Sequence, residues 1–437
     1  MRIVRIGLFA IVLATLIGMP AFSSGKAETG AAGSSTAPTK LTYWTFQTIH
    51  KPFYADMLKR WNDQNPTKQI DLTMVDYPNA DMHNKLQLAF QSGVGAPDFV
   101  DININYFSNF VKGDIHLLPL NKIVDPVRKD FVPSRFAIYT KNGNVYGLPT
   151  HVGATVVYYN KEVMDKAGIN IDNINTYADF VAAGKKLLAA TGIPMVAFEV
   201  TNQRPFWPFI VQQGSDYVDA NGKVILDNQI NINTLQTMYD WMYKDKIAAP
   251  MAGGDSTKEE FFTAMDKGQY GSIIMPMWYM SRFITAMPDL KGKIYVRPLP
   301  VWKAGDFRSA GMGGTGTSVT DQSKSPQVAM EFLAFAKLSH EAAVRIWTDL
   351  KFDPARVEAW SDPALTAPDP YFGNEDVFKV LRNLGPSQMP SPLSETTSLS
   401  SAAQTIVINQ VMYQALVQKQ PVAQVLKTAA DELRKQQ

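Results

Sequence analysis

The sequence predicts an α/β protein of two lobes, each an open sheet with helices on its faces. The first observation behind this is an alternation of strand-like and helix-like periodicity that starts near residue 40 and continues along the chain. The second is a pair of extended segments rich in small residues, 149–155 and 311–316, that lie far apart between groups of such elements. A two-lobed chain with a discontinuous first lobe requires two such crossings, and a few residues suffice for a hinge.

Residues 1–27 are predicted to be a signal peptide. Arg2 and Arg5 precede an apolar run at 6–19, and small residues follow at plausible cleavage sites, Ala21/Ser23 and Gly25/Ala27. The run is short for a membrane span, although a retained anchor is the alternative. Residues 28–39 have the composition of a flexible linker. The mature protein is therefore expected outside the cytoplasm, in the periplasm, with no later stretch able to span a bilayer.

The amino-acid composition excludes several kinds of site and argues against others. The chain has 437 residues and no cysteine, so it contains no thiol nucleophile, no thiolate metal site and no lipid-anchoring cysteine, and its core alone must stabilise it. Cleavage after Ala27 would remove three of the positive charges and no acid, changing the net charge from +2 to −1. A near-neutral chain without basic runs does not indicate nucleic-acid binding. The five histidines are scattered, so neither a metal nor another cofactor is expected.

The first hundred mature residues alternate strand, helix, strand, helix, strand. The expected elements are strands at 41–46, 70–75 and 99–102, separated by helices at 54–61 and 82–90. This order predicts a parallel sheet with right-handed crossovers. Ligands bind such sheets beyond the carboxyl ends of the strands, here 44–47, Tyr77 and 101–105.

The same alternation continues to the C-terminus. Strands or extended segments are expected at 156–159, 195–200, 270–275 and 294–300. Helices are expected at 161–167, 177–190, 206–213, 232–243, 258–266, 327–338, 402–416 and 422–434, with Pro- and Ser-rich loops at 361–392. The glycine cluster 311–316 contains no lysine, and 317–321 is not helical in pattern, so a hinge or close packing is favoured over phosphate binding.

Six segments carry a family resemblance. They are YGLPTHVGATVVYYNKEVMDKAGI (146–169), LTYWTF (41–46), LQLAFQSGVGAPDFVDI (86–102), RPFWPFIVQQGSD (204–216), MPMWYMSRF (275–283) and SPQVAMEFLAFAKLSHEAAVRIW (325–347). In this order they resemble the solute-binding proteins of ABC sugar importers, the group that includes maltose-binding protein, and the arabino-oligosaccharide and lactose binders within it. Met275 departs from the family pattern, which has glycine there.

The resemblance implies a type II periplasmic-binding-protein fold. Lobe 1 would comprise 40–149 and 313–362, and lobe 2 would comprise 150–312 and 363–437. A sugar or short oligosaccharide would bind in the cleft, and lobe closure would present it to the transmembrane subunits of an ABC permease. The protein would be a monomer and not an enzyme. Maltose-binding protein has an aromatic residue on its penultimate helix where this chain has SLSSAAQ (398–404), which favours a shorter ligand.

Sugars require hydrogen-bonding groups for their hydroxyls and aromatic planes for their C–H faces. By family position Trp44, Trp207 and Trp278 are candidate stacking residues, whereas Trp61, Trp241 and Trp347 lie on apolar helix faces and are expected in the core, the commoner place for any tryptophan. Asp101 is the candidate hydroxyl acceptor, with Asn103 and Asn105 on the same side of an extended chain. The remaining candidates are Gln47, His50, His151, Glu199, Asn202, Arg308, Gly313 and Gly314. Helix capping is the alternative for Gln47 and His50, and a structural role is the alternative for His151.

Three other functions remain open. A secreted carbohydrate-active enzyme requires a pair of carboxylates, which sequence spacing does not reveal, and no hydrolase or metalloprotease motif is present. The same scaffold also binds peptides, polyamines or metals, but the aromatic and amide candidates favour a sugar. A purely structural domain would not need two crossings.

Overall fold

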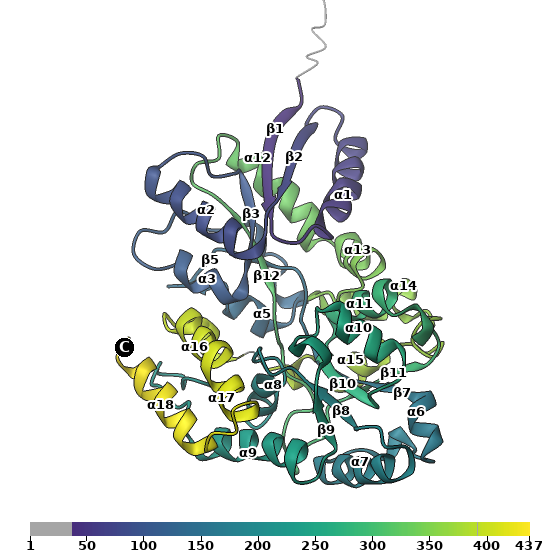
Figure 1. Ribbon diagram of the computed structural model, residues 1–437. Coiled ribbons are helices and arrows are strands. Elements are labelled where there is room, and N and C mark those ends of the chain that lie inside the picture. The colour runs from purple at the N-terminus through teal and green to yellow at the C-terminus, as the bar shows by residue number, and fades with distance from the viewer. Residues whose placement is uncertain (1–36, 391) are drawn as a thin grey trace, which may run out of the picture. The chain divides into compact units, whose positions relative to one another are not determined.

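The computed structural model describes residues 37–390 and 392–437, so the predicted signal peptide and most of the predicted linker lie outside the described residues. The first sheet has the order β2-β1-β3-β12-β6 (Figure 1). Its strands are β1 (Thr39–Thr45), β2 (Ile70–Asp76), β3 (Phe99–Asn103), β6 (Leu148–Pro149) and β12 (Thr315–Val319). β1 pairs in parallel with β2 and β3, as predicted, whereas β12 pairs antiparallel with β3 and β6. A strand from late in the chain thus completes the sheet built by its start.

The second sheet has the order β11-β7-β10-β8-β9 and is mixed rather than parallel. Its strands are β7 (Thr155–Asn160), β8 (Val196–Phe198), β9 (Ala248–Pro250), β10 (Ser272–Pro276) and β11 (Ile294–Pro298). A separate hairpin joins β4 (Thr140–Lys141) to β5 (Asn144–Val145). With their flanking helices the two larger sheets form two lobes, in agreement with the predicted fold class.

Helices flank both sheets (Figure 1). Those that precede β7 or directly follow β12 are α1 (His50–Gln64), α2 (Asn79–Ser92), α3 (Ile104–Phe110), α4 (Asn121–Val124), α5 (Pro133–Ala137), α12 (Pro326–Leu333) and α13 (His340–Leu350). The others are α6 (Lys161–Lys166), α7 (Tyr177–Thr191), α8 (Phe206–Val211), α9 (Gln229–Tyr243), α10 (Glu259–Asp266), α11 (Met280–Ala286), α14 (Pro363–Thr366), α15 (Lys379–Leu384), α16 (Ser400–Ile406), α17 (Met412–Leu416) and α18 (Val422–Arg434). Among the described residues, no helix has the length and apolar character that a membrane crossing needs.

The structure differs from the sequence-based expectations at three places. The first helix, expected at 54–61, is present but begins earlier, at His50; its N-cap is Ile49, and no side chain caps it. The strand alternation expected through Asn105 stops at Asn103, because the Asn103 side chain accepts a hydrogen bond from the Asn105 amide and starts α3. The expected loop at 361–392 contains the short helices α14 and α15. Short helices like these bury few side chains and leave little periodic signal.

The core contains the tryptophans expected there. Trp61, Trp241 and Trp347 are 7%, 2% and 3% exposed. Trp241 stacks on Phe180 at a ring-centroid distance of 5.6 Å, and Trp347 packs edge-on against Phe378 at 4.6 Å. These contacts confirm the helical-face analysis, because each ring lies on the buried side of its helix.

Three passages of chain lie side by side between the sheets, at 150–155, 310–315 and 352–355. Gly153 and Met312 are joined by a hydrogen bond from the Met312 amide, and Ala154 bridges Gly311. Both carboxylate oxygens of Asp353 accept from the first passage, from the amides of Gly153 at 3.2 Å and Ala154 at 2.8 Å. Gly153 has φ +70°, and a Cβ there would lie 2.3 Å from the Met312 carbonyl oxygen, so only glycine fits.

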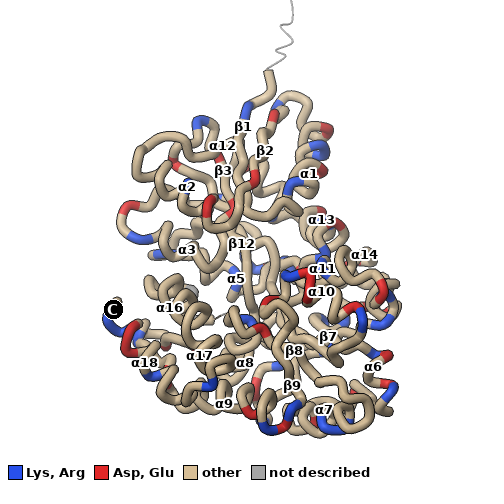
Figure 2. Tube along the Cα trace, in the orientation of Figure 1, with Lys and Arg blue, Asp and Glu red and all other residues tan. Residues whose placement is uncertain are grey.

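Lys and Arg positions alternate with Asp and Glu positions along the chain in Figure 2. Helix α1, for example, carries the ion pairs Arg60–Asp56 and Lys59–Asp63 one turn apart. A surface of mixed sign is typical of a protein without a polyanionic partner.

Candidate ligand-binding cleft

A cavity of about 270 Å³ lies where elements of both sheets meet the chain passages. Its lining residues are Phe46, Gln47, His50, Asn79, Asn103, Ile104, Asn105, His151, Asn202, Gln203, Arg204, Trp207, Thr257, Trp278, Arg282, Met312, Gly313, Gly314, Thr315 and Phe352. We call this cavity the cleft. A larger cavity of about 1030 Å³ lies beside β11 and α15, away from the passages.

Ten of the fourteen sequence-predicted site residues line the cleft. They are Gln47, His50, Asn103, Asn105, His151, Asn202, Trp207, Trp278, Gly313 and Gly314. The structure thus gathers side chains from segments more than 250 residues apart into one cavity.

The other four, Trp44, Asp101, Glu199 and Arg308, lie outside the cleft lining. Trp44 is 8% exposed and packs edge-on against Tyr77 at 5.3 Å. Glu199 is fully buried and its oxygens bind Arg204 and the amide of Ser256. Arg308 lines the larger cavity, and its Nη2 donates to Asn175.

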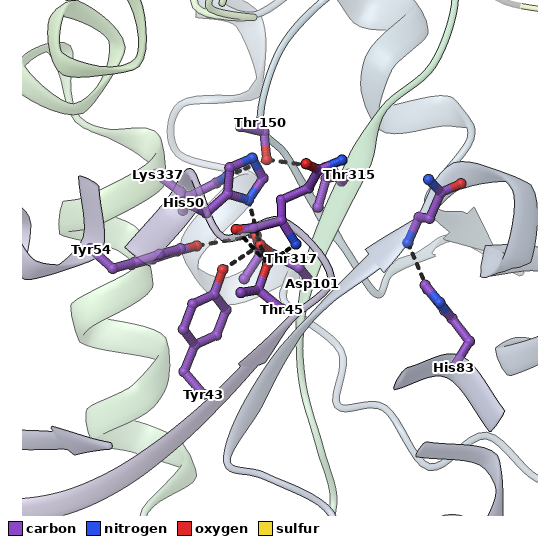
Figure 3. Close-up of polar contacts among 12 residues, drawn as sticks. Tyr43, Thr45, His50, Tyr54, His83, Asp101, Thr150, Thr315, Thr317 and Lys337 are labelled. Carbon is purple, nitrogen blue, oxygen red and sulfur yellow. Dashed lines mark hydrogen bonds and ion pairs between the residues drawn. The ribbon is translucent and has the colours of Figure 1, made fainter. Parts of the chain in front are cut away.

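Asp101 is fully buried behind the cleft and organises its floor (Figure 3). Its carboxylate accepts from Tyr43, from the Thr45 hydroxyl at 3.1 Å, from His50 Nδ1 at 2.7 Å and from the Thr317 hydroxyl at 2.7 Å. Burial by itself raises the pKa of Asp101, but the charge and hydrogen bond of His50, with the charge of Lys337, outweigh burial and lower it to about 2. The ionised carboxylate therefore fixes β1, α1, β3 and β12 relative to one another.

Two histidines of the cleft lining have buried ring nitrogens that lack a hydrogen-bond partner among the described residues. His50 donates through Nδ1 to Asp101, and its Nε2 has no protein partner. His151 is 5% exposed, packs on the Phe352 ring at 5.0 Å, and neither ring nitrogen has a protein partner. Burial, then the charges of Arg135, His50 and Lys337, hold the pKa of His151 well below its usual value, so it is neutral. A neutral imidazole offers one donor and one acceptor, which suits a hydroxyl.

His83 holds the backbone of two asparagines, Asn79 and Asn103, on the first-lobe wall of the cleft. Its Nδ1 donates to the backbone carbonyl of Asn79 at 2.6 Å, which leaves Nε2 to accept from the backbone amide of Asn103 at 2.9 Å. Burial lowers the pKa of His83 to about 4, so this tautomer persists at neutral pH. The half-buried ring of Phe46 lies 5.4 Å from His83 and completes this wall.

The second-lobe wall carries two indoles and two guanidiniums. Trp207 is 1% exposed, stacks on Tyr217 at 5.5 Å and donates to Asp216 at 3.0 Å, so only an edge of it reaches the cleft. Trp278 is half-buried and donates to the Met312 carbonyl at 3.1 Å, which ties the wall to the second chain passage. Arg204 and Arg282 complete the wall.

Several lining residues escaped the sequence reasoning, among them Phe46, Asn79, Gln203, Arg204, Arg282 and Phe352. Two of them, Arg204 and Arg282, lie in the segments RPFWPFIVQQGSD and MPMWYMSRF. In these segments only the tryptophans were predicted to contact a ligand. Phe46 is the last residue of the predicted first strand, and this position at the strand end is the signal that could have identified it.

The arrangement suits a polyhydroxylated solute. Side-chain amides and imidazoles supply donors and acceptors, while Phe46 and Trp278 supply aromatic surface. No group of three or more potential metal ligands exists among the residues that the structure describes.

Comparisons with known proteins agree with this geometry. The family described as "Bacterial extracellular solute-binding protein" matches residues 46–342. The arabinooligosaccharide-binding protein of Halalkalibacterium halodurans is 43% identical over 391 residues, which is 89% of this chain and 88% of that protein. The protein of the same name from Bacillus subtilis is 43% identical over 432 residues, 98% of each. The GacH receptor of Streptomyces glaucescens shares the fold, with a TM-score of 0.76 and 20% identity over 92% of this chain and 98% of that one.

Proposed function

Because this chain belongs to the bacterial extracellular solute-binding proteins, we propose that it captures short arabino-oligosaccharides outside the cytoplasm for an ABC importer. One observation carries the choice of solute: two arabinooligosaccharide-binding proteins are 43% identical to the chain, one of them over 98% of both lengths. The cleft supports it, because aromatic faces and unpartnered imidazoles from both lobes converge there.

The proposed mechanism is lobe closure around the ligand. Open and closed forms interconvert, and a ligand stabilises the closed form by contacting both lobes at once. Residues 150–155 and 310–315 are the proposed hinges, with the lobe boundaries 40–149 with 313–362 and 150–312 with 363–437. The closed monomer would then dock on the transmembrane subunits of a permease and release its solute to them.

The ligand should be short. Ligand pockets run from roughly 300 to 1000 Å³, and the cleft, at about 270 Å³, is near the low end of that scale. The sites we propose for ligand contact are the ten predicted residues that line the cleft, with Phe46 added.

A carbohydrate-active enzyme is the less favoured alternative. Glycoside hydrolysis uses two carboxylates that flank the scissile bond. The side chains that line the cleft, within the described part of the chain, include no carboxylate, and the family and its two relatives are binding proteins by name. Incubation with arabino-oligosaccharides should therefore return them uncleaved.

Isothermal titration calorimetry on the mature protein tests the proposal. Arabinobiose, arabinotriose and arabinotetraose should each release heat, with matched xylo-, galacto- and gluco-oligosaccharides as comparisons. A solute panel in which only amino acids or peptides bind would overturn the sugar assignment, and binding confined to another sugar would overturn the arabinose assignment.

A further inference from the structure

The charged side chains that line the cleft have one sign. Arg204 and Arg282 are its only Arg, Lys, Asp or Glu residues within the described part of the chain. A site for neutral sugars needs acceptors as well as donors, so a wall with two guanidiniums and no carboxylate calls for an explanation.

Arg204 is already neutralised within the protein. Its Nε lies 2.7 Å from Glu199 Oε2, and its Nη2 lies 3.0 Å from Asp255 Oδ2. Burial works against the charge of Arg204, but these two carboxylates outweigh it and raise the pKa of the guanidinium. Two carboxylates therefore already balance the charge of Arg204, which does not require a charged ligand.

Arg282 has no such partner. It lies in the first turn of α11, and its only side-chain hydrogen bond to a described residue runs from Nη1 to the hydroxyl of Ser281 at 3.2 Å. No Asp or Glu among the described residues forms an ion pair with it, and Glu199 and Asp255 contact Arg204 instead. Burial and the like charge of Arg204 lower the pKa of Arg282, although Tyr279 opposes them.

A partly buried guanidinium without a counter-ion is costly unless a ligand supplies one. Its planar fork matches the two oxygens of a carboxylate, and such charge-assisted pairs are stronger than neutral hydrogen bonds. The open donors of Arg282 line the cleft beside Trp278, one of its aromatic faces.

We infer that Arg282 binds a carboxylate on the ligand, so that the preferred solute is an acidic oligosaccharide that carries a uronic acid. This inference rests on the proposed sugar-binding function and narrows it. Arg204 is not expected to bind the ligand carboxylate, because Glu199 and Asp255 already balance its charge.

The test compares arabino-oligosaccharides that bear one uronic acid with the same molecules after reduction of the carboxyl group to a primary alcohol. Titration calorimetry at low ionic strength should show the acidic member binding about tenfold more tightly, or better. Added NaCl should narrow that ratio, because it screens the ion pair. Arabinose 5-phosphate is a third probe, since a phosphate ester offers a guanidinium the same oxyanion chemistry.

The substitution Arg282→Gln should bring the ratio of acidic to neutral affinity close to one, and Arg282→Lys should retain part of it. Arg345→Gln is the control, since it removes the same charge from α13 at a residue that does not line the cleft. Far-ultraviolet circular dichroism checks that each variant is folded. If a variant does not fold, the salt titration of the unaltered protein still tests the inference.

Equal affinity for the acidic and reduced forms would overturn the inference and leave the proposed function standing. A preference that survives Arg282→Gln, or preference for the phosphate ester alone, would overturn it as well. If no arabino-oligosaccharide binds in either form, the proposed function itself fails.

Discussion

At the scale of single residues, position along a strand decides which side chain meets the ligand cleft. Trp44 is the penultimate residue of β1, and Phe46 is two residues further along the chain. Phe46 lies just beyond the strand and lines the cleft, whereas Trp44 is packed against Tyr77. Two residues amount to about 7 Å of strand, which is enough to move a ring from the cleft into the core.

Trp278→Ala should weaken oligosaccharide binding by at least about tenfold, because it removes an aromatic face of the cleft. Trp44→Ala is the comparison and should change affinity by no more than about threefold, since Trp44 does not line the cleft. Calorimetric titration measures both. An equal loss of affinity in the two variants would contradict the assignment of the cleft.

Asp101→Asn should destabilise the protein by about 3 kcal/mol, because a buried ion pair loses one member while its donors remain. Urea unfolding measures this loss. Asp71→Asn in β2 of the same sheet is the control, since Asp71 is exposed. A loss below about 1 kcal/mol would show that the Asp101 network contributes little.

The Asp101 carboxylate should make the free energy of unfolding depend on pH. Its pKa is lowered to about 2 in the folded protein and is about 3.9 when unfolded, so the unfolded state binds the proton more readily. The resulting stabilisation, about 2.6 kcal/mol, is present above pH 4 and is lost as the pH falls from about 4 to 2. As the pH falls through this range, the free energies of unfolding of the unaltered protein and Asp101→Asn should converge. A difference that stays constant with pH would contradict the lowered pKa of Asp101.

At the scale of elements, the three chain passages behave as one hydrogen-bonded unit. Asp353 joins the third passage to the first, and Met312 joins the second to the first. Burial raises the pKa of Asp353 to about 7, although the amides of Ala154 and Gly153 oppose it. The Asp353 carboxylate and the Met312 amide thus join the three passages, and at Gly153 the packing leaves no room for a Cβ.

Gly153→Ala tests that close packing. The positive φ alone costs about 1–2 kcal/mol, and overlap with the Met312 carbonyl adds about 1–3 kcal/mol. Gly143→Ala is the matched control, because Gly143 has φ +80° and nothing within 4 Å of an added Cβ. Thermal and urea unfolding should show Gly153→Ala as clearly the less stable variant, and equal losses would argue against tight packing of the passages.

At the scale of the whole molecule, the cleft exists because distant segments converge on it. The described lining runs from Phe46 to Phe352 and draws on both lobes. The proposed closure follows from this composition, since one ligand that contacts both lobes favours the form in which they are closest.

Small-angle scattering should show a smaller radius of gyration with a saturating arabino-oligosaccharide than without it. The same ligand at one hundred times its Kd should add about 2.7 kcal/mol to the free energy of unfolding, visible as a higher Tm. Trp278→Ala at equal ligand concentration is the control for both effects. Superimposable scattering curves together with an unchanged Tm would contradict capture by closure.

The sequence by itself determined the order and type of most elements and the segments that form the cleft. Val422–Arg434 has the predicted bounds, and the helical faces of Trp61, Trp241 and Trp347 are buried as expected. These features follow from local periodicity, which neighbouring residues alone encode. The order of motifs likewise identified the family, because it extends along nearly the whole chain.

Only the tertiary structure decided which polar groups face the ligand. Glu199 and Asp101 follow or end predicted strands, as a binding carboxylate would, yet Arg204 and His50 bind them inside the protein. Arg282 received no such partner and lines the cleft. Ion pairing joins residues far apart in sequence, so the side chain left for a ligand is known only once all its possible partners have been placed.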